Sequence, residues 1–120
     1  MAVRAIRGAV QLDVDEREHL LASTRELVDA VMTANGLTPD DLVNVFFTCT
    51  PDLTSEFPAV AARETGLGSV PLLCAVEVDV AGAMPRVVRL MALAETDRSR
   101  EEIQHVYLRG AVALRRDIAQ

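Results

Sequence analysis

The sequence contains no lysine, no tryptophan and few aromatic residues of any kind. All twelve basic residues are arginine, whose planar guanidinium suits bidentate contacts with carboxylate or phosphate groups. Aromatic residues make up only 3% of the chain, which excludes a row of rings that stacks on unpaired bases. The net charge of −6 argues against general binding to nucleic acid or anionic membranes, because both require clustered positive charge.

Cysteine, metal ligands and targeting signals are also sparse. Cys49 and Cys74 each lie in an apolar run, where a free cysteine usually packs as a small hydrophobic residue. His19 lies among charges and His105 has no second ligand at a useful spacing, so we expect no metal site. No glycine-rich loop leads into a helix, which makes a nucleotide site improbable. Without a signal-peptide pattern or an apolar run of about 20 residues, the sequence predicts a cytoplasmic protein.

The pattern of apolar residues predicts one α+β domain that spans residues 1–120. Helical spacing indicates a long amphipathic helix from Asp15 to Asn35, and a short alanine-rich helix should run from Phe57 to Gly66. Two capped single turns are expected at residues 38–41 and 99–103. Five strands are predicted, at residues 2–12, 42–50, 71–78, 86–94 and 105–114.

Several of these strands are apolar on both faces, as in residues 87–93. A sheet with this pattern is covered on both sides, but two helices can cover only one. We therefore expect the second face to pack against further copies of the same chain, in a homo-oligomer with a sheet-lined centre.

Charged residues interrupt the strands at positions that otherwise predict burial. Arg89 shares a face with Val87 and Met91, and a buried arginine is costly unless an anion meets it. Arg7, Arg115 and Glu77 have similar strand positions. Internal salt bridges are one explanation, but one carboxylate cannot neutralise three cations. The surplus predicts a pocket for a small organic dianion, with no set of acid-base or nucleophilic groups beside it.

Several short motifs, in this order and spacing, resemble the small monofunctional chorismate mutases of the AroH class, and the resemblance covers almost the whole chain. They are Ile6-Arg7-Gly8-Ala9, Thr50-Pro51-Asp52-Leu53, Phe57-Pro58-Ala59 with Arg63, residues 74–80 with Gly82, Arg89-Leu90-Met91, and His105-Val106-Tyr107-Leu108 with Leu114, Arg115 and Asp117. The resemblance implies a homotrimer of mixed five-stranded sheets around a barrel-like centre, with active sites between subunits. It also implies the Claisen rearrangement of chorismate, a dicarboxylate, to prephenate without a cofactor, in the biosynthesis of phenylalanine and tyrosine.

The resemblance also assigns roles to residues. Arg89 is expected to donate to the ether oxygen and a carboxylate, Arg7 to hold a carboxylate, and Glu77 to accept from the ring hydroxyl. The substrate-binding residues implied by the resemblance are Phe57, Ala59, Arg63, Leu73, Cys74, Tyr107, Leu114 and Arg115, partly from the adjacent subunit. Two alternatives remain open: an imine or enamine deaminase built on a similar trimer, and a non-catalytic protein that binds a small dicarboxylate.

Overall fold

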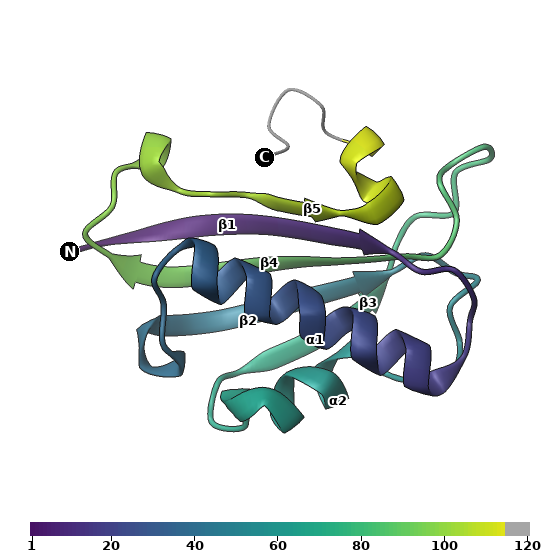
Figure 1. Ribbon diagram of the computed structural model, residues 1–120, viewed down its shortest axis with the longest axis horizontal. Coiled ribbons are helices and arrows are strands. Elements are labelled where there is room, and N and C mark those ends of the chain that lie inside the picture. The colour runs from purple at the N-terminus through teal and green to yellow at the C-terminus, as the bar shows by residue number, and fades with distance from the viewer. Residues whose placement is uncertain (115–120) are drawn as a thin grey trace.

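The computed structural model describes residues 1–114 and contains one mixed five-stranded sheet, in the order β3-β2-β4-β1-β5 (Figure 1). The strands are β1 (Ala2–Gln11), β2 (Leu42–Cys49), β3 (Leu72–Val76), β4 (Val87–Thr96) and β5 (Val106–Leu108). Strand β4 pairs antiparallel with both β1 and β2, whereas the edge strands β5 and β3 pair parallel with β1 and β2. The fold class predicted from the sequence is thereby confirmed.

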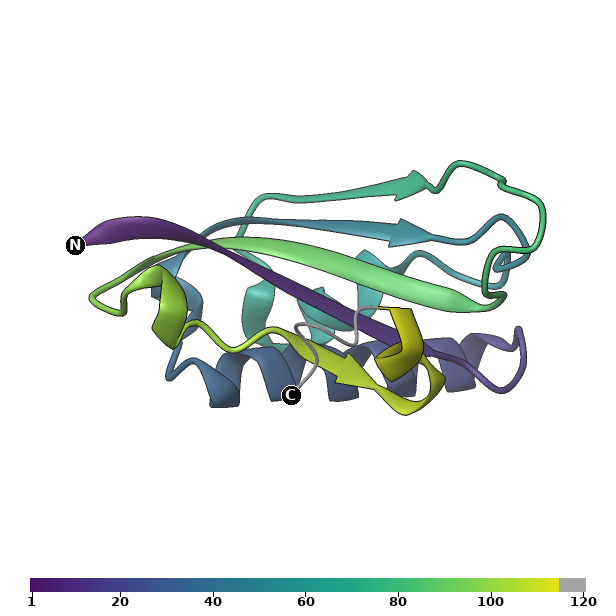
Figure 2. The ribbon, with the colours of Figure 1, turned by 90° about the horizontal axis from the view of Figure 1, so that it is seen from above.

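Both predicted helices are present and lie on the same face of the sheet (Figure 2). Helix α1 (Arg17–Ala34) begins after Glu16, whose side chain accepts a hydrogen bond from the backbone of His19, and it ends at Asn35. Helix α2 (Pro58–Ala62) starts with proline at its first position, where the missing N–H costs nothing. It continues into a wider turn, η2 (Arg63–Leu67), which ends as Gly66 takes a positive φ of 99°.

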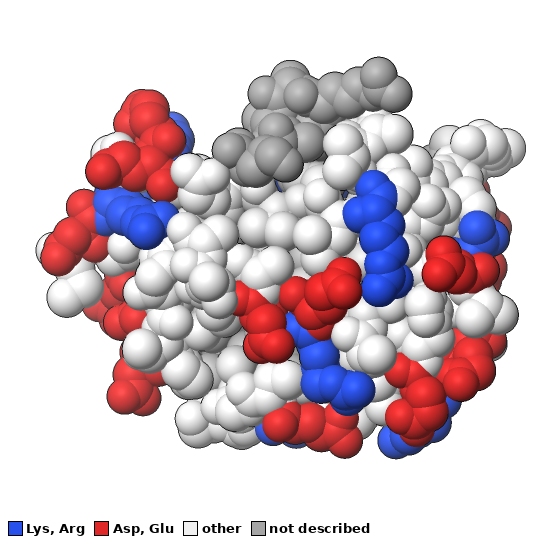
Figure 3. All heavy atoms as spheres, viewed as in Figure 1, with Lys and Arg blue, Asp and Glu red and all other residues white. Residues whose placement is uncertain are grey.

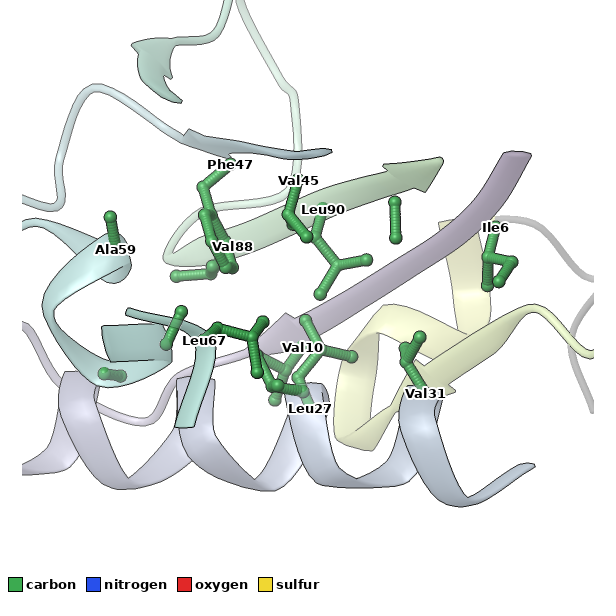
Figure 4. Close-up of a cluster of buried hydrophobic side chains, with 14 of the residues drawn as sticks. Ile6, Val10, Leu27, Val31, Val45, Phe47, Ala59, Leu67, Val88 and Leu90 are labelled. Carbon is green, nitrogen blue, oxygen red and sulfur yellow. The ribbon is translucent and has the colours of Figure 1, made fainter. Parts of the chain in front are cut away.

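The core lies between this face of the sheet and the two helices. Alternate residues of the strands point into it, including Ile6 and Val10 of β1 and Phe47 of β2. Leu27 and Val31 of α1 pack against them from the helix side (Figure 4). This period-two burial places the intervening strand residues, including Arg7 and Arg89, on the opposite face.

On the opposite face of the sheet, called the open face below, described residues cover only the end at Ala9 and Val87, which are buried against Tyr107 and Ala111. No described element lies over the remainder of the open face (Figure 2). Its apolar side chains are correspondingly exposed: Phe46 is 42% exposed, Met91 41% and Leu73 59%. The helix-covered face differs, because acidic and basic side chains are interspersed over it (Figure 3) and form pairs such as Arg25–Glu64 and Arg109–Glu26. The sequence-based expectation of an uncovered second face is therefore confirmed for the part of the face that carries Phe46, Leu73 and Met91, but not for the end at Ala9 and Val87.

The capped turns were correctly predicted, as η1 (Pro39–Asp41) and η3 (Arg100–Glu102). The last strand was predicted wrongly, because β5 ends at Leu108 and residues Arg109–Leu114 form a 3-10 helix, η4. Arg109 takes a positive φ of 56°, which ends the extended chain, and its side chain reaches back to Ser23 of α1 at 2.9 Å. Arg115, which was expected to close that strand, lies outside the described residues. None of the described helices has the length and apolar character needed to cross a membrane.

Candidate active site

Three of the predicted site residues line one pocket of about 370 Å³ on the open face. Arg7 comes from β1, Arg89 from β4 and Tyr107 from β5. The small residue Ala9 is paired with Arg89 on one side and with Tyr107 on the other. Ala9 is fully buried and packs with Tyr107, Val87 and Ala111 in a small apolar cluster, so the packing of this cluster holds Tyr107 beside the hollow. The sheet thus places two cations and a phenol around one hollow.

Arg89 also meets the predicted carboxylate, Glu77. Its Nε lies 3.1 Å from Oε2 of Glu77, so the two form an ion pair. The Nε atom is buried but makes no aligned hydrogen bond, and the side chain as a whole is 40% exposed. The prediction that the strand buries Arg89 is therefore wrong for a single chain, because the part of the open face around its side chain has no described cover.

Glu77 lies just beyond β3, at the start of the loop to β4. Its backbone N–H donates to the carbonyl of Cys49 at 2.9 Å, which extends the pairing with β2 by one step. A second hollow of about 550 Å³ lies beside this loop and is lined by Glu77, Arg89 and Leu114, among others. Arg89 lines both hollows, so it joins the site of Arg7 and Tyr107 to that of Glu77 and Leu114.

Leu73 and Cys74 lie on β3, which is an edge strand. The carbonyl of Pro71 and the N–H of Glu77 bond to β2, and in a parallel ladder such bonds come from alternate residues. The backbone of Cys74 therefore faces the free edge of the sheet. Its side chain packs against the core, whereas that of Leu73 lies on the open face. A backbone donor at this edge is compatible with the expected contact to a substrate hydroxyl.

The predicted residues Phe57, Ala59 and Arg63 do not line either hollow within one chain. Ala59 belongs to α2 and is buried in the core, whereas Phe57 is 66% exposed and Arg63 is also exposed. Arg115 lies outside the described residues. The structure of one chain thus brings together Arg7, Arg89, Tyr107, Glu77 and Leu114, and leaves the α2 residues on the other side of the sheet.

The two arginines of the pocket differ in how far nearby carboxylates neutralise their charge. Among residues 1–114, Arg7 is in no ion pair, whereas Arg89 has one carboxylate partner. The backbone N–H of Arg7 donates to Nδ1 of His105 at 3.0 Å, and burial, followed by the charge of Arg7, lowers the pKa of that histidine. No three potential metal ligands lie close together within the described part of the chain. The pocket therefore presents positive charge that is suited to an anionic ligand.

Neither cysteine provides an evident nucleophile. Burial, followed by the nearby Cys74 and Glu77, raises the pKa of Cys49 to about 12, so its thiol stays protonated at neutral pH. Cys74 is half-buried and packs against the core. The chemistry of the site therefore depends on the charged and hydroxyl groups of Arg7, Glu77, Arg89 and Tyr107, and not on a thiol.

The sequence reasoning missed Thr48, Phe46 and the backbone of Gly8, which also line the first pocket. Thr48 and Phe46 alternate with the buried residues of β2, so the strand pattern does place them on the open face. Their residue types gave no further signal, because threonine and phenylalanine are common in strands.

Comparison with known proteins is consistent across almost the entire chain. Residues 3–118 match the family model described as chorismate mutase type I. The chain is 50% identical over 117 residues to chorismate mutase AroH of Thermus thermophilus, which covers 97% of this chain and 96% of that protein. It is 38% identical over 120 residues to chorismate mutase AroH of Bacillus subtilis, with 99% of this chain and 94% of that protein covered.

A solved structure matches equally well. The chorismate mutase from Clostridium thermocellum superposes with a TM-score of 0.90 at 39% sequence identity. The match covers 91% of this chain and 97% of that chain. The fold and the family therefore rest on independent comparisons of sequence and structure.

Proposed function

The chain belongs to the chorismate mutase type I family, whose reaction is the rearrangement of chorismate to prephenate, and we propose that Arg7, Glu77 and Arg89 carry out this reaction here. It is therefore an isomerase that acts on a dicarboxylate. One observation supports the residue assignment above all: Arg89 joins the carboxylate of Glu77 to the pocket that holds Arg7, a cation with no ion-pair partner among residues 1–114. We further propose that the product feeds phenylalanine and tyrosine biosynthesis in the cytoplasm.

Arg89 is proposed to stabilise the transition state. In this rearrangement the carbon–oxygen bond breaks ahead of carbon–carbon bond formation, so negative charge grows on the ether oxygen. A fixed cation beside that oxygen stabilises the transition state more than the ground state, which is the condition for catalysis. The ion pair with Glu77 engages Nε of Arg89, which leaves the two Nη groups to donate to the ether oxygen and a carboxylate.

Arg7 and Tyr107 are proposed to bind the carboxylates of the substrate. They line the same hollow as Arg89 and come from neighbouring strands of a rigid sheet. Chorismate must fold so that its two reacting carbons approach each other, and clamps on its carboxylates restrict the rotations that oppose this. No proton needs to move in such a step, which agrees with a site built from arginines.

Glu77 and the backbone of Cys74 are proposed to bind the ring hydroxyl of the substrate. The hydroxyl would donate to the Glu77 carboxylate and accept from the free backbone edge of β3. Leu114 lines the hollow beside Glu77, and Leu73 and Arg115 are assigned to the same cleft by resemblance. These contacts would orient the ring relative to Arg89.

We propose that the active protein is a homotrimer in which the open faces of three sheets form the centre. The apolar side chains exposed on that face in one chain support this assembly. Phe57, Ala59 and Arg63 lie away from the hollows of their own chain, and the proposal assigns them to the cleft of an adjacent subunit. Arg63 would then add a further cation to those of Arg7, Arg89 and Arg115.

Chorismate turnover by the purified protein tests the function. We expect loss of chorismate and stoichiometric formation of prephenate, without added metal or cofactor. Binding of chorismate without turnover would indicate a non-catalytic dicarboxylate-binding protein. Hydrolysis of an imine or enamine substrate, with chorismate left intact, would indicate a deaminase.

A further inference from the structure

Thr48 lies between Arg89 and Glu77, two of the three charged residues proposed to carry out the reaction. On β2 it is the direct neighbour of Arg89 on one side and of Ala75 of β3 on the other. Glu77 follows Ala75 by two residues, on the same face of the sheet. One short polar side chain therefore separates the cation of β4 from the carboxylate at the end of β3.

The hydroxyl of Thr48 donates to Oε2 of Glu77 at 2.7 Å. Within residues 1–114 this is the side-chain hydrogen bond that Glu77 makes, since the Nε of Arg89 lies 3.1 Å from the same oxygen without hydrogen-bond alignment. An ion pair without alignment leaves a carboxylate free to rotate, whereas a short bond from a hydroxyl fixes its direction. Thr48 thus sets the orientation of Glu77.

We propose that Thr48 is a positioning residue for the rearrangement, which acts by holding Oε2 of Glu77 so that Oε1 accepts from the ring hydroxyl of the substrate. The inference rests on the proposed function of Glu77 and adds a residue to it. No bond from residues 1–114 engages Oε1. Thr48 and Arg89 line the same hollow, so the held carboxylate, the cation and the pocket form one unit.

The hydroxyl, rather than the bulk of the side chain, carries this role. Valine has nearly the same shape as threonine and suits a strand equally well, but it cannot donate to a carboxylate. Serine keeps the donor and loses only a methyl group. The pair Thr48→Val and Thr48→Ser therefore separates the hydrogen bond from packing.

Steady-state kinetics on chorismate test the proposal. We expect Thr48→Val to lower kcat by about ten- to a hundredfold, the range for losing a hydrogen bond to a charged group, with a smaller change in KM because the arginines remain. Thr48→Ser should stay within about threefold of the wild type. Thr96→Val is the matched control. Thr96 is a half-buried threonine of β4, about seven residues after Arg89, and its hydroxyl accepts a hydrogen bond from the backbone N–H of Arg98. Its replacement should leave kcat unchanged.

A double-mutant cycle with Glu77→Ala shows whether Thr48 acts through Glu77. If it does, adding Thr48→Val to Glu77→Ala should cause no further loss of kcat, whereas independent roles would multiply. The inference would be overturned if the fold-losses in kcat of the two variants multiplied, or if Thr48→Val kept the kcat of the wild type. Turnover of chorismate by the wild-type protein would still support the proposed function in either case. Absence of chorismate turnover in the wild type would overturn the function itself. Circular dichroism and mass are measured for each variant, and Thr48→Ala replaces Thr48→Val if the latter does not fold.

Discussion

At the scale of single residues, the proposed role of Arg89 requires that its charge stabilise the transition state more than the bound substrate. The carboxylate of Glu77 lies 3.1 Å from Nε of Arg89, and a cation already in place needs little reorganisation as charge develops on the substrate. A lysine would keep the charge but would place it at a single point on a flexible stem. The planar fork is therefore the property to test.

Arg89→Ala should raise the activation free energy by at least the roughly 3 kcal/mol typical of losing one oxyanion donor. This corresponds to a fall in kcat of about a hundredfold or more. KM should change much less, because Arg7 and Tyr107 still bind the carboxylates. Arg89→Lys should remain strongly impaired. Steady-state kinetics on chorismate measure both effects, with variants that are folded and have the same assembled mass as the wild type. Near wild-type turnover of Arg89→Lys would refute the role assigned to the guanidinium.

His105 makes stability depend on pH near the site. The backbone N–H of Arg7 donates to its Nδ1 at 3.0 Å, which requires that this nitrogen carry no proton. Burial, followed by the charge of Arg7, lowers the pKa of His105 in the folded protein below the ordinary value of 6.5. Because the unfolded chain binds the proton more tightly, this stabilisation is fully present above about pH 6.5. It is lost as the pH falls through the lowered folded pKa.

We expect His105→Gln to reduce the loss of stability between pH 8 and pH 5, relative to the wild type. Glutamine offers a carbonyl oxygen to the N–H of Arg7 and does not titrate. Urea unfolding at both pH values measures the difference. His19→Gln is the control, because it removes the other histidine, which accepts from the backbone of Asp13 at 3.0 Å, and should keep the acid loss due to His105. Equal pH dependence in wild type and His105→Gln would contradict the assignment.

Individual residues of the site differed in how far the sequence could predict them. Arg7, Arg89 and Glu77 stand out because a charge on an otherwise apolar strand is costly, and that cost is visible without a structure. Thr48 carries no such signal, since a threonine is at home in any strand. Its role depends on the register that places β2 between β3 and β4, and register is a property of the folded sheet.

At the scale of elements, the packing of α1 on β1 depends on Gly8. A Cβ at this position would lie 3.1 Å from side-chain atoms of both Leu27 and Val31, and 3.4 Å from Leu90. The helix therefore sits close to the strand that carries Arg7 and Ala9. Any bulk at Gly8 has to displace the helix or bend the strand beside the pocket.

Gly8→Val should destabilise the protein by about 1–3 kcal/mol, the usual cost of overpacking a core. Gly8→Ala should cost less, because a shift of a few tenths of an ångström in flexible side chains accommodates one methyl group. Gly68→Val serves as control, since nothing lies within 4 Å of a Cβ at that glycine. Denaturant unfolding measures all three, and unchanged stability of Gly8→Val would show that α1 does not press on β1 as described.

The elements themselves could be predicted where local patterns decide them. Proline, asparagine and capping residues set both ends of α1, the start of α2 and the two capped turns, and these were predicted to within about two residues. The α-helix of α2 ends at Ala62 rather than at the predicted Gly66, because the chain widens there into η2. The last strand was predicted too long because residues 110–114 form an apolar run, which suits a buried strand. In the structure Arg109 leaves the extended region and bonds to α1. A contact made 86 residues away in sequence cannot be seen in a local pattern.

At the scale of the whole molecule, a single chain does not explain why apolar side chains are exposed on the open face. Exposed Phe46, Leu73 and Met91 on one face of a sheet would be unusual in a monomer of this size. Light scattering at assay concentrations should give three times the 13.0 kDa of one chain. A fully active monomer would remove the model of interface sites.

Mixed trimers test whether each site draws on two subunits. Arg89→Ala and Arg63→Glu should each be nearly inactive alone, the first through the lost donor and the second because a carboxylate repels the dianion. If Arg63 serves the neighbouring cleft, random trimers of the two variants contain about a quarter of sites with both wild-type residues. Co-expressed protein should then regain about a quarter of wild-type turnover. If both residues served the same chain, every site would keep one defect and no activity would return. An active Arg63→Glu protein would instead exclude Arg63 from the cleft, so the recovered fraction decides whether the α2 residues complete a partner's site.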